Sequence, residues 1–196
     1  MRAVRTEGDV LLCEGYKDVI AFHAAGIRHA AGLCGTALTE DHVRMIRRLT
    51  GHVTLALDPD PAGQAATLRS ARLLLAQGCE VGLLPLPGGM DPDEMFRRQG
   101  AEALRRLVRT EAVDYLSHRI RKAAGRKGGP DAGGIREVLG EIRLVGSPLA
   151  VYQRVEELSK ATGIPLDVLR EELSASPGEP VRTLSLIHIS EPTRPY

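Results

Sequence analysis

Four short apolar segments recur through the first half of the chain, each separated from the next by a stretch of helical spacing or a polar connection. They cover residues 10–13, 29–33, 53–57 and 80–86. Short runs without polar alternation are typical of strands buried on both faces, as in parallel sheets covered by helices. The alternation of such runs with helical stretches predicts an α/β fold, with a mainly parallel sheet flanked by helices.

Acidic residues follow the predicted strands in three clusters. The clusters lie at residues 14–18, 58–63 and 91–93, and their acidic members are Glu14, Asp18, Asp58, Asp60, Asp91 and Asp93. Ligands of parallel sheets bind beyond the carboxyl ends of the strands. We therefore expect these carboxylates to meet at one edge of the sheet.

Carboxylates gathered in this way repel one another unless protons or a cation neutralise them. Two unit charges about 4 Å apart cost about 4 kcal/mol at an effective dielectric constant of 20. Ligand sets made only of oxygen suit Mg²⁺ or Mn²⁺ rather than zinc. Asp58 and Asp60 are spaced to reach one ion or a pair, and Gly63 permits close approach of backbone or phosphate.

An ordinary explanation exists for each cluster taken alone. Asp-Pro and Asp-x-Asp pairs are common in turns and as helix caps. Three such clusters in sequence, two of them directly after predicted strands, favour a divalent-metal site for phosphoryl chemistry over three unrelated turns.

The second half of the chain has helical spacing only. Helices are predicted over residues 94–99, 101–109 and 112–124, followed by a Gly-rich loop or linker at 125–134 and then by two or three further helices. The basic pairs Arg121-Lys122 and Arg126-Lys127 could contact phosphate, but a solvated loop is the favoured interpretation. Residues 158–173 fit a helical hairpin better than a helix-turn-helix, because the second helix lacks a cluster of base-reading side chains. Residues 176–196 are predicted to be a disordered tail, and residues 184–196 resemble a translated sequencing adapter and are excluded from the fold.

Composition limits the classes of function. The 26 Lys and Arg residues nearly balance 25 Asp and Glu residues, so the chain has no overall basic field for nucleic acid. Cys13, Cys34 and Cys79 are widely spaced and are predicted to be buried, reduced thiols. Neither a membrane span nor a signal peptide is recognisable, which predicts a cytoplasmic chain with no membrane partner.

The order of these motifs carries a resemblance to a known family. The pattern Glu14-Gly15-Tyr16-x-Asp18, then Gly35-Thr36, then Asp58-x-Asp60-x-Ala62-Gly63, then Asp91-Pro92-Asp93 resembles the TOPRIM domain of bacterial DnaG-type primases. The resemblance implies a TOPRIM catalytic domain over residues 1–110 and the helical end of the polymerase domain over 111–175.

The resemblance also implies a chemistry. Asp58, Asp60, Asp91 and Asp93 would help to bind Mg²⁺ (or Mn²⁺), with Glu14 as a metal ligand or general acid/base and Asp18 in support. The reaction would be metal-dependent nucleotidyl transfer from ribonucleoside triphosphates on a single-stranded DNA template, as in a DNA-directed RNA polymerase that makes primers during replication. Tyr16 would pack or position, since no covalent nucleophile is needed.

The resemblance further implies segments that this chain lacks. Relatives carry a zinc-ribbon domain and a basic half of the polymerase domain upstream, and contact the replicative helicase through a C-terminal domain. We therefore expect an internal fragment, a monomer without zinc, that keeps the metal site but not the template-gripping surface. The alternatives are another TOPRIM enzyme, such as a nuclease or a topoisomerase piece, and a non-catalytic module that binds metal or nucleotide.

Overall fold

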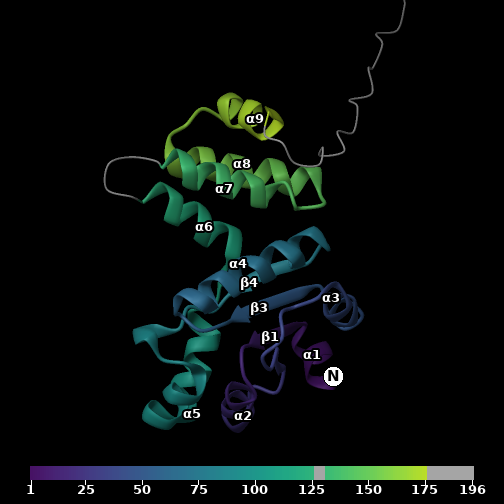
Figure 1. The fold of residues 1–196 in the computed structure, drawn as a ribbon, viewed down its shortest axis with the longest axis vertical. Helices are drawn as coiled ribbons and strands as arrows, with labels where there is room; N and C mark the ends of the chain where they lie inside the picture. Colours follow the sequence, from purple (N-terminus) through teal and green to yellow (C-terminus); the bar gives the residue numbers. More distant parts are fainter. Residues whose placement is uncertain (126–130, 176–196) are drawn as a thin grey trace, which may run out of the picture.

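The computed structural model describes residues 1–125 and 131–175, and within them one five-stranded sheet is the central element (Figure 1). The strands are β1 (Asp9–Cys13), β2 (Ala30–Gly32), β3 (His52–Ala56), β4 (Glu80–Leu83) and β5 (Val113–Asp114). Their order in the sheet is β2-β1-β3-β4-β5. The pairs among β1 to β4 are parallel, and β5 is antiparallel to β4. The prediction of a mainly parallel sheet flanked by helices is confirmed.

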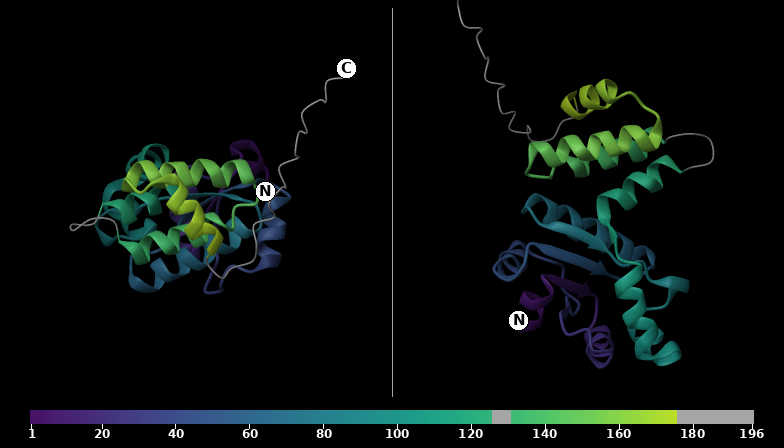
Figure 2. Two further views of the ribbon diagram at one scale, coloured as in Figure 1. Left: turned by 90° about the horizontal axis from the view of Figure 1, so that it is seen from above. Right: turned by 180° about the vertical axis from the view of Figure 1, so that it is seen from behind.

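Helices cover both faces of this sheet. They are α1 (Arg2–Glu7), α2 (Tyr16–Ala24), α3 (Glu40–Arg47), α4 (Pro61–Ala76), α5 (Pro92–Thr110), α6 (Tyr115–Ala124), α7 (Ala132–Ile142), α8 (Pro148–Thr162) and α9 (Leu166–Ala175), with a short 3₁₀ turn at Pro87–Gly89. Figures 1 and 2 show α4 on one face and α2 with α5 on the other, while α7, α8 and α9 lie beyond α4.

Strand β1 shows why the apolar runs are continuous rather than alternating. Val10 and Leu12 pack into the core on one face of the sheet, whereas Leu11 and Cys13 pack into the core on the other. All four side chains are buried. Because both faces are covered, all four positions from Val10 to Cys13 are apolar, as expected for a central strand of a parallel sheet.

The core between the sheet and α4 continues into the helices that follow. Val81 of β4, Leu74 of α4, Ile120 of α6 and Leu158 of α8 belong to one cluster of buried side chains. The helical part therefore packs against the sheet domain through a shared apolar core. The domain boundary near residue 110 remains a prediction.

A buried ion pair joins two helices of this part. Glu141 of α7 is fully buried, and Arg119 of α6 donates to both of its carboxylate oxygens, over 3.2 and 3.0 Å. Arg119 also donates to Glu137 over 3.0 Å. A buried carboxylate held in this way fixes α6 against α7, because losing Arg119 would remove both of these charge-assisted hydrogen bonds and leave only Arg72, at 3.9 Å, as a cationic partner.

Several local predictions need correction. The amino-terminal helix α1 was not predicted, and the predicted helix at 112–124 begins only at Tyr115, after the two residues of β5. The fourth strand ends at Leu83 rather than at residue 86. The two helices predicted at 94–99 and 101–109 are confirmed as the two segments of α5, because Gly100 between them has a non-helical backbone with a φ of 80° and a ψ of 177°.

The cysteines also differ in part from the prediction. All three are free, and Cys13 and Cys79 are buried as predicted, but Cys34 is exposed. Cys34 lies two residues beyond the end of β2, where the chain has left the sheet, so no layer of helices covers it. The predicted tail at 176–196 and most of the loop between α6 and α7 lie outside the described residues.

Within the described part of the chain, none of the helices combines the length and the apolar composition needed to cross a bilayer.

Candidate metal centre at the carboxyl edge of the sheet

Parallel pairing brings the first two acidic clusters to the same edge of the sheet. Cys13, the last residue of β1, pairs with Ala56, the last residue of β3. Glu14 follows the first strand directly, and Asp58 follows the other after one intervening residue. The two carboxylates therefore leave adjacent strands at the same level, as the strand pattern predicts.

The loop from Asp58 to α4 is closely packed. Asp60 is the N-cap of α4, and its Oδ1 accepts a hydrogen bond from the backbone N–H of Gly63 over 2.6 Å. A Cβ added to Gly63 would lie only 2.1 Å from the backbone oxygen of Asp58. Only glycine allows the loop to fold back so closely on the helix. The expectation that Gly63 permits close backbone approach is confirmed.

Two more of the predicted residues also cap or brace helices. Asp91 is the N-cap of α5 and accepts from the backbone N–H of Glu94 over 2.6 Å. Asp18 accepts from the backbone N–H of Gly15 over 2.9 Å, at the start of α2. The ordinary role of a helix cap is thus present at these carboxylates, and it also holds each of them in a fixed orientation at the edge.

Asp93 and Glu14 complete the predicted set. Asp93 lies in the first turn of α5 and pairs with Arg97, one turn further along the same helix. Glu14 is exposed to solvent. Tyr16 is 63% exposed at the first position of α2, so of the two predicted roles packing is wrong and positioning stays a prediction.

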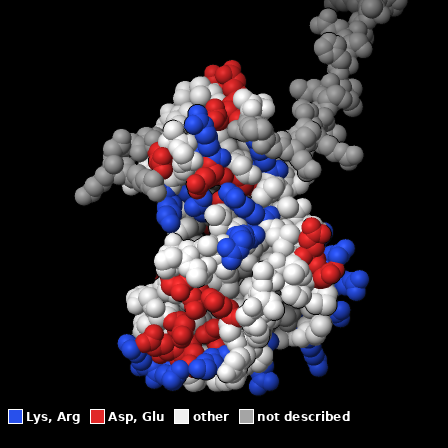
Figure 3. All heavy atoms as spheres, in the orientation of Figure 1, with Lys and Arg blue, Asp and Glu red and all other residues white. Residues whose placement is uncertain are grey.

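The carboxylates act on one another electrostatically. Burial first, and then the negative charges of Glu14, Asp18, Asp91 and Asp60, together raise the pKa of Asp58 to about 6. The pKa of Asp18 is also raised, first by burial and then by the charges of Asp91 and Asp93. Figure 3 shows acidic side chains gathered on the lower part of the molecule, where β3 ends and α5 begins. All three clusters therefore contribute to one negative region.

One oxygen of this region suits a cation. Oδ1 of Asp58 is buried and has no hydrogen-bond partner among the described residues, which is unfavourable for a carboxylate oxygen unless a cation or proton meets it. Within residues 1–125 and 131–175, no three His, Cys, Asp or Glu side chains already form a group ready to hold a metal ion. The donor set is of oxygen only at Asp58 and its acidic neighbours, which fits a hard divalent cation.

A groove begins at Asp58 and runs to the helical part of the chain. Its volume is about 470 Å³, and its walls come from the end of β3, the first half of α4, the segment after β4, and α6. Its basic side chains are His118, Arg119 and Lys122 of α6. The sequence indicates a phosphate contact at the pair Arg121-Lys122, but nothing in the sequence connects this pair to the acidic edge. The remaining part of that basic run, Arg126 and Lys127, lies outside the described residues.

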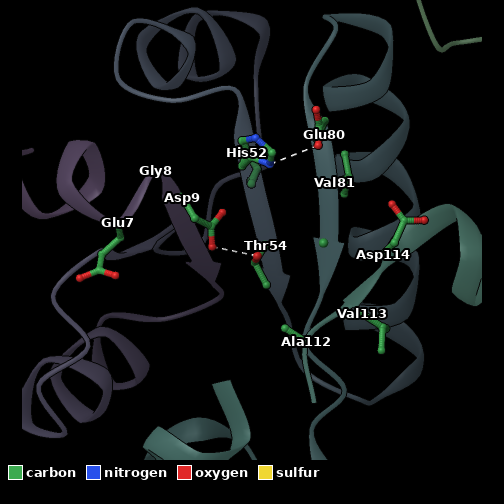
Figure 4. A pocket seen from close by; sticks show the side chains of 12 residues that line it. Glu7, Gly8, Asp9, His52, Thr54, Glu80, Val81, Ala112, Val113 and Asp114 are labelled. Atoms are coloured by element: carbon green, nitrogen blue, oxygen red, sulfur yellow. Dashed lines mark hydrogen bonds and ion pairs between the residues drawn. The ribbon is translucent and has the colours of Figure 1, made fainter. Parts of the chain in front are cut away.

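The opposite edge of the sheet holds a larger cavity of about 550 Å³ (Figure 4). Here Asp9 accepts from Thr54 over 2.9 Å through one of its oxygens, and His52 lies 3.3 Å from Glu80. Asp114 pairs with Arg154 over 2.8 Å. The amino ends of parallel strands carry residues that stabilise the fold more often than residues that react.

The chain matches the family model described as Toprim-like over residues 11–96. It is 33% identical over 174 residues to the DNA primase of Halalkalibacterium halodurans, covering 87% of this chain and 29% of that protein. It is 34% identical over 158 residues to the DNA primase of Clostridium acetobutylicum, covering 79% of this chain and 26% of that protein. The chain thus spans less than a third of the length of these relatives.

The solved structures that this chain resembles are also primases. The zinc-binding and RNA polymerase domains of the Aquifex aeolicus primase match with a TM-score of 0.75 at 28% identity, over 86% of this chain and 40% of that one. A DnaG primase catalytic domain bound to single-stranded DNA matches with a TM-score of 0.67 at 26% identity, over 83% of this chain and 54% of that one. The likeness covers both the sheet and the helices that follow it.

Proposed function

Because the chain belongs to the bacterial DnaG-type primases, we propose that its acidic edge is the place where ribonucleotides are joined during primer synthesis on single-stranded DNA. The reaction is attack of a ribonucleotide 3′-hydroxyl on the α-phosphate of a nucleoside triphosphate, which forms a phosphodiester bond, breaks the bond to the β-phosphate and releases pyrophosphate, while the hydroxyl proton passes to a base or to water. A magnesium or manganese ion bound at the edge would stabilise the attacking and leaving oxygens. The whole enzyme also requires a DNA-gripping surface, which the proposal assigns to parts of the protein outside this chain.

The burial and hydrogen bonds of each carboxylate indicate its role in binding the cation. Asp58, with its buried and unpartnered Oδ1, is the central ligand. Asp60 and Asp91 each use one oxygen to cap a helix, which aims the carboxylate and leaves the second oxygen for a cation. Asp93 adds negative charge from the first turn of α5. These side chains bind and orient, and none of them needs to form a covalent bond with the substrate.

Glu14 and Asp18 act beside them. Glu14 is exposed, so it can exchange a proton with solvent and serve as a metal ligand or as a general acid/base. Asp18 is buried and accepts from the backbone N–H of Gly15, the residue after Glu14. This hydrogen bond fixes the backbone that carries Glu14, which makes Asp18 a supporting residue.

The observation that carries the proposal is the environment of Asp58. Four other carboxylates, drawn from all three clusters, each raise its pKa in the folded chain. A fold that places so many like charges around a partly buried carboxylate is favoured when a cation is bound there. The reaction class follows from the family, whose named members are DNA primases.

The proposal extends to partners. The template is single-stranded DNA, the substrates are ribonucleoside triphosphates, and the setting is the bacterial cytoplasm. The whole protein would be a monomer. It would bind the replicative helicase through a part outside this chain, and it would bind zinc only in its upstream part. A nuclease or topoisomerase activity is not favoured, because the named relatives are DNA primases.

The test restores the part of the enzyme that this chain does not include. The chain is joined to the upstream region of the Halalkalibacterium halodurans relative, and dinucleotide and primer synthesis are measured with Mg²⁺ or Mn²⁺. We expect Asp58→Asn and Asp60→Asn to lower the rate by about 100-fold or more, since each removes a charge that stabilises the transition state. Glu80→Gln, at the opposite edge of the sheet, is the matched control and keeps the full rate.

Two outcomes would contradict the proposal. Unchanged synthesis in folded Asp58→Asn would remove this carboxylate from the mechanism. Divalent-dependent nicking of supercoiled DNA without primer synthesis would assign the site to another TOPRIM activity. Circular dichroism of each variant separates loss of activity from loss of fold.

A further inference from the structure

The groove that begins at Asp58 has two chemically different parts. Its floor is apolar and includes Leu68 of α4 together with Leu84 and Leu86 from the segment after β4. Its far wall is the basic face of α6. Clefts of roughly 300–1,000 Å³ with apolar walls and a few placed polar groups are typical of small-molecule sites. At about 470 Å³, this groove suits a ligand the size of one nucleotide.

The three basic residues of the wall are not equivalent. Arg119 is committed to Glu137 and the buried Glu141, so its charge is already neutralised by the fold. Lys122 is exposed and, in the part of the chain that the structure describes, pairs with no carboxylate. Lys122 is therefore the cation of this wall that can meet an incoming anion.

His118 shows that the wall is positively charged. Its pKa is lowered by burial and by the positive charges of Arg121, Lys122 and Arg119. In Figure 3, basic side chains lie at the waist of the molecule, directly above the acidic region. An anion in the groove would relieve the repulsion among these groups and would lie between them and the acidic edge.

We propose that this groove between α4 and α6 binds a nucleoside phosphate, with a phosphate against Lys122 and His118 and the base over Leu68 and Leu86. The inference rests on the proposed function, because it gives the incoming nucleotide a place beside the acidic edge. Lys122 and His118 are positioning residues in this arrangement. An anion held there would have the basic wall on one side and a cation bound at Asp58 on the other.

Binding to the chain itself tests the inference. The probes are ATP with Mg²⁺, inorganic triphosphate with Mg²⁺, and a twelve-residue thymidine oligonucleotide, each followed by titration calorimetry. We expect Lys122→Gln to weaken ATP binding by about tenfold, as when one charge-assisted hydrogen bond is lost. Arg121→Gln removes the same charge from the neighbouring position, which does not line the groove, and should keep the affinity within about twofold.

The remaining arms separate the possible failures. ATP should bind the unchanged chain more tightly than inorganic triphosphate, because only ATP has a base to cover the apolar floor. Equal ATP affinity for the unchanged chain and Lys122→Gln would overturn the inference, as would equal losses in Lys122→Gln and Arg121→Gln. A loss confined to the oligonucleotide would also overturn it, since the wall would then hold a strand.

A metal titration keeps the two proposals apart. Lys122→Gln should bind Mn²⁺ alone as the unchanged chain does, since it removes no carboxylate. If Mn²⁺ binds normally and the ATP affinity does not depend on Lys122, the nucleotide site is wrong and the proposed function stands. If the unchanged chain binds no Mn²⁺, the proposed function itself fails.

Discussion

Carboxylates line both the amino and the carboxyl edge of the sheet, but the charge of the neighbouring side chains differs between the two edges. At the amino edge, Glu80 lies beside the imidazole of His52 and Asp114 beside the guanidinium of Arg154, so each of these carboxylates has a basic side chain as its neighbour. At the carboxyl edge, the groups that act on Asp58 are other carboxylates, and burial adds to their effect. The first arrangement stabilises the chain by itself, whereas the second is stabilised by a bound cation.

The size of a cavity does not distinguish the two edges. The amino-edge cavity, at about 550 Å³, is larger than the groove at Asp58, at about 470 Å³. Each edge also has one buried carboxylate oxygen without a partner among the described residues, on Asp9 and on Asp58. The two carboxylates differ in their neighbouring side chains. Asp9 accepts a hydrogen bond from Thr54 through its other oxygen, whereas the side chains that act on Asp58 are other carboxylates. Repulsion between like charges marks the reactive edge better than volume does.

The largest expected effect on stability comes from a change in backbone packing at the carboxyl edge. In Gly63→Ala, the new Cβ would lie 2.1 Å from the backbone oxygen of Asp58, so the loop must move. We expect the free energy of unfolding to fall by about 3 kcal/mol, as for other overpacked sites. Urea denaturation followed by circular dichroism measures the change.

The matched control lies at the amino edge. Gly51 immediately precedes β3, and a Cβ added to it would meet nothing within 4 Å. Gly51→Ala should change stability by no more than about 0.5 kcal/mol. Equal costs for the two substitutions would show that the carboxyl edge is no more tightly packed than the amino edge.

A smaller effect, with the opposite sign, is expected from removing the charge of Asp58. Its pKa is about 6 in the folded chain, above the ordinary value of 3.8, so the folded state holds a proton that the unfolded state releases first. Stability is therefore lost as the pH rises from about 4 through 6. After allowance for solvent screening, Asp58→Asn should raise the free energy of unfolding by about 1 kcal/mol at pH 8 without divalent ions.

The same substitution should have almost no effect at pH 4, where the carboxyl group of Asp58 is mostly protonated in the folded chain and about half protonated in the unfolded one. Denaturation curves at pH 4 and pH 8, with a chelator present, provide the comparison. A variant that is less stable than the unchanged chain at pH 8 would mean that Asp58 is held by favourable contacts, and the contrast between the edges would disappear.

The smallest effect is expected at the amino edge. His52 and Glu80 are 3.3 Å apart, with 59% and 79% of their side chains exposed. Exposed pairs of this kind contribute less than about 1 kcal/mol. Glu80→Gln should lower the melting temperature by no more than about 2 °C. A larger shift would make the amino edge more than a set of surface ion pairs.

Much of the sheet could be predicted from the sequence because its strands are buried on both faces. The run Val10–Cys13 is apolar throughout, and burial of all four side chains explains this pattern. β5 could not be predicted, since two residues at Val113–Asp114 carry no periodicity. The helix α1 was missed for a similar reason, because Val4 is its only buried residue.

The acidic edge was predictable in its members but not in its electrostatics. Asp-Pro spacing after a strand places Asp58 and Asp60 correctly, yet the same spacing also produces helix caps, and Asp60 proved to be one. Burial of Asp58 depends on how α4 returns over the loop, which is a tertiary feature. The connection from Asp58 to Lys122 was also hidden, because these residues lie far apart in the sequence and meet only through the groove.

The central claim is that the carboxylates of three clusters converge to hold one kind of cation. The direct measurement is titration of the chain with Mn²⁺, with free Mn²⁺ followed by electron paramagnetic resonance. The account predicts that the chain removes Mn²⁺ from solution, that Asp58→Asn weakens this binding by about tenfold or more, and that Glu80→Gln leaves it unchanged. Equal Mn²⁺ affinity in Asp58→Asn and the unchanged chain would contradict the account.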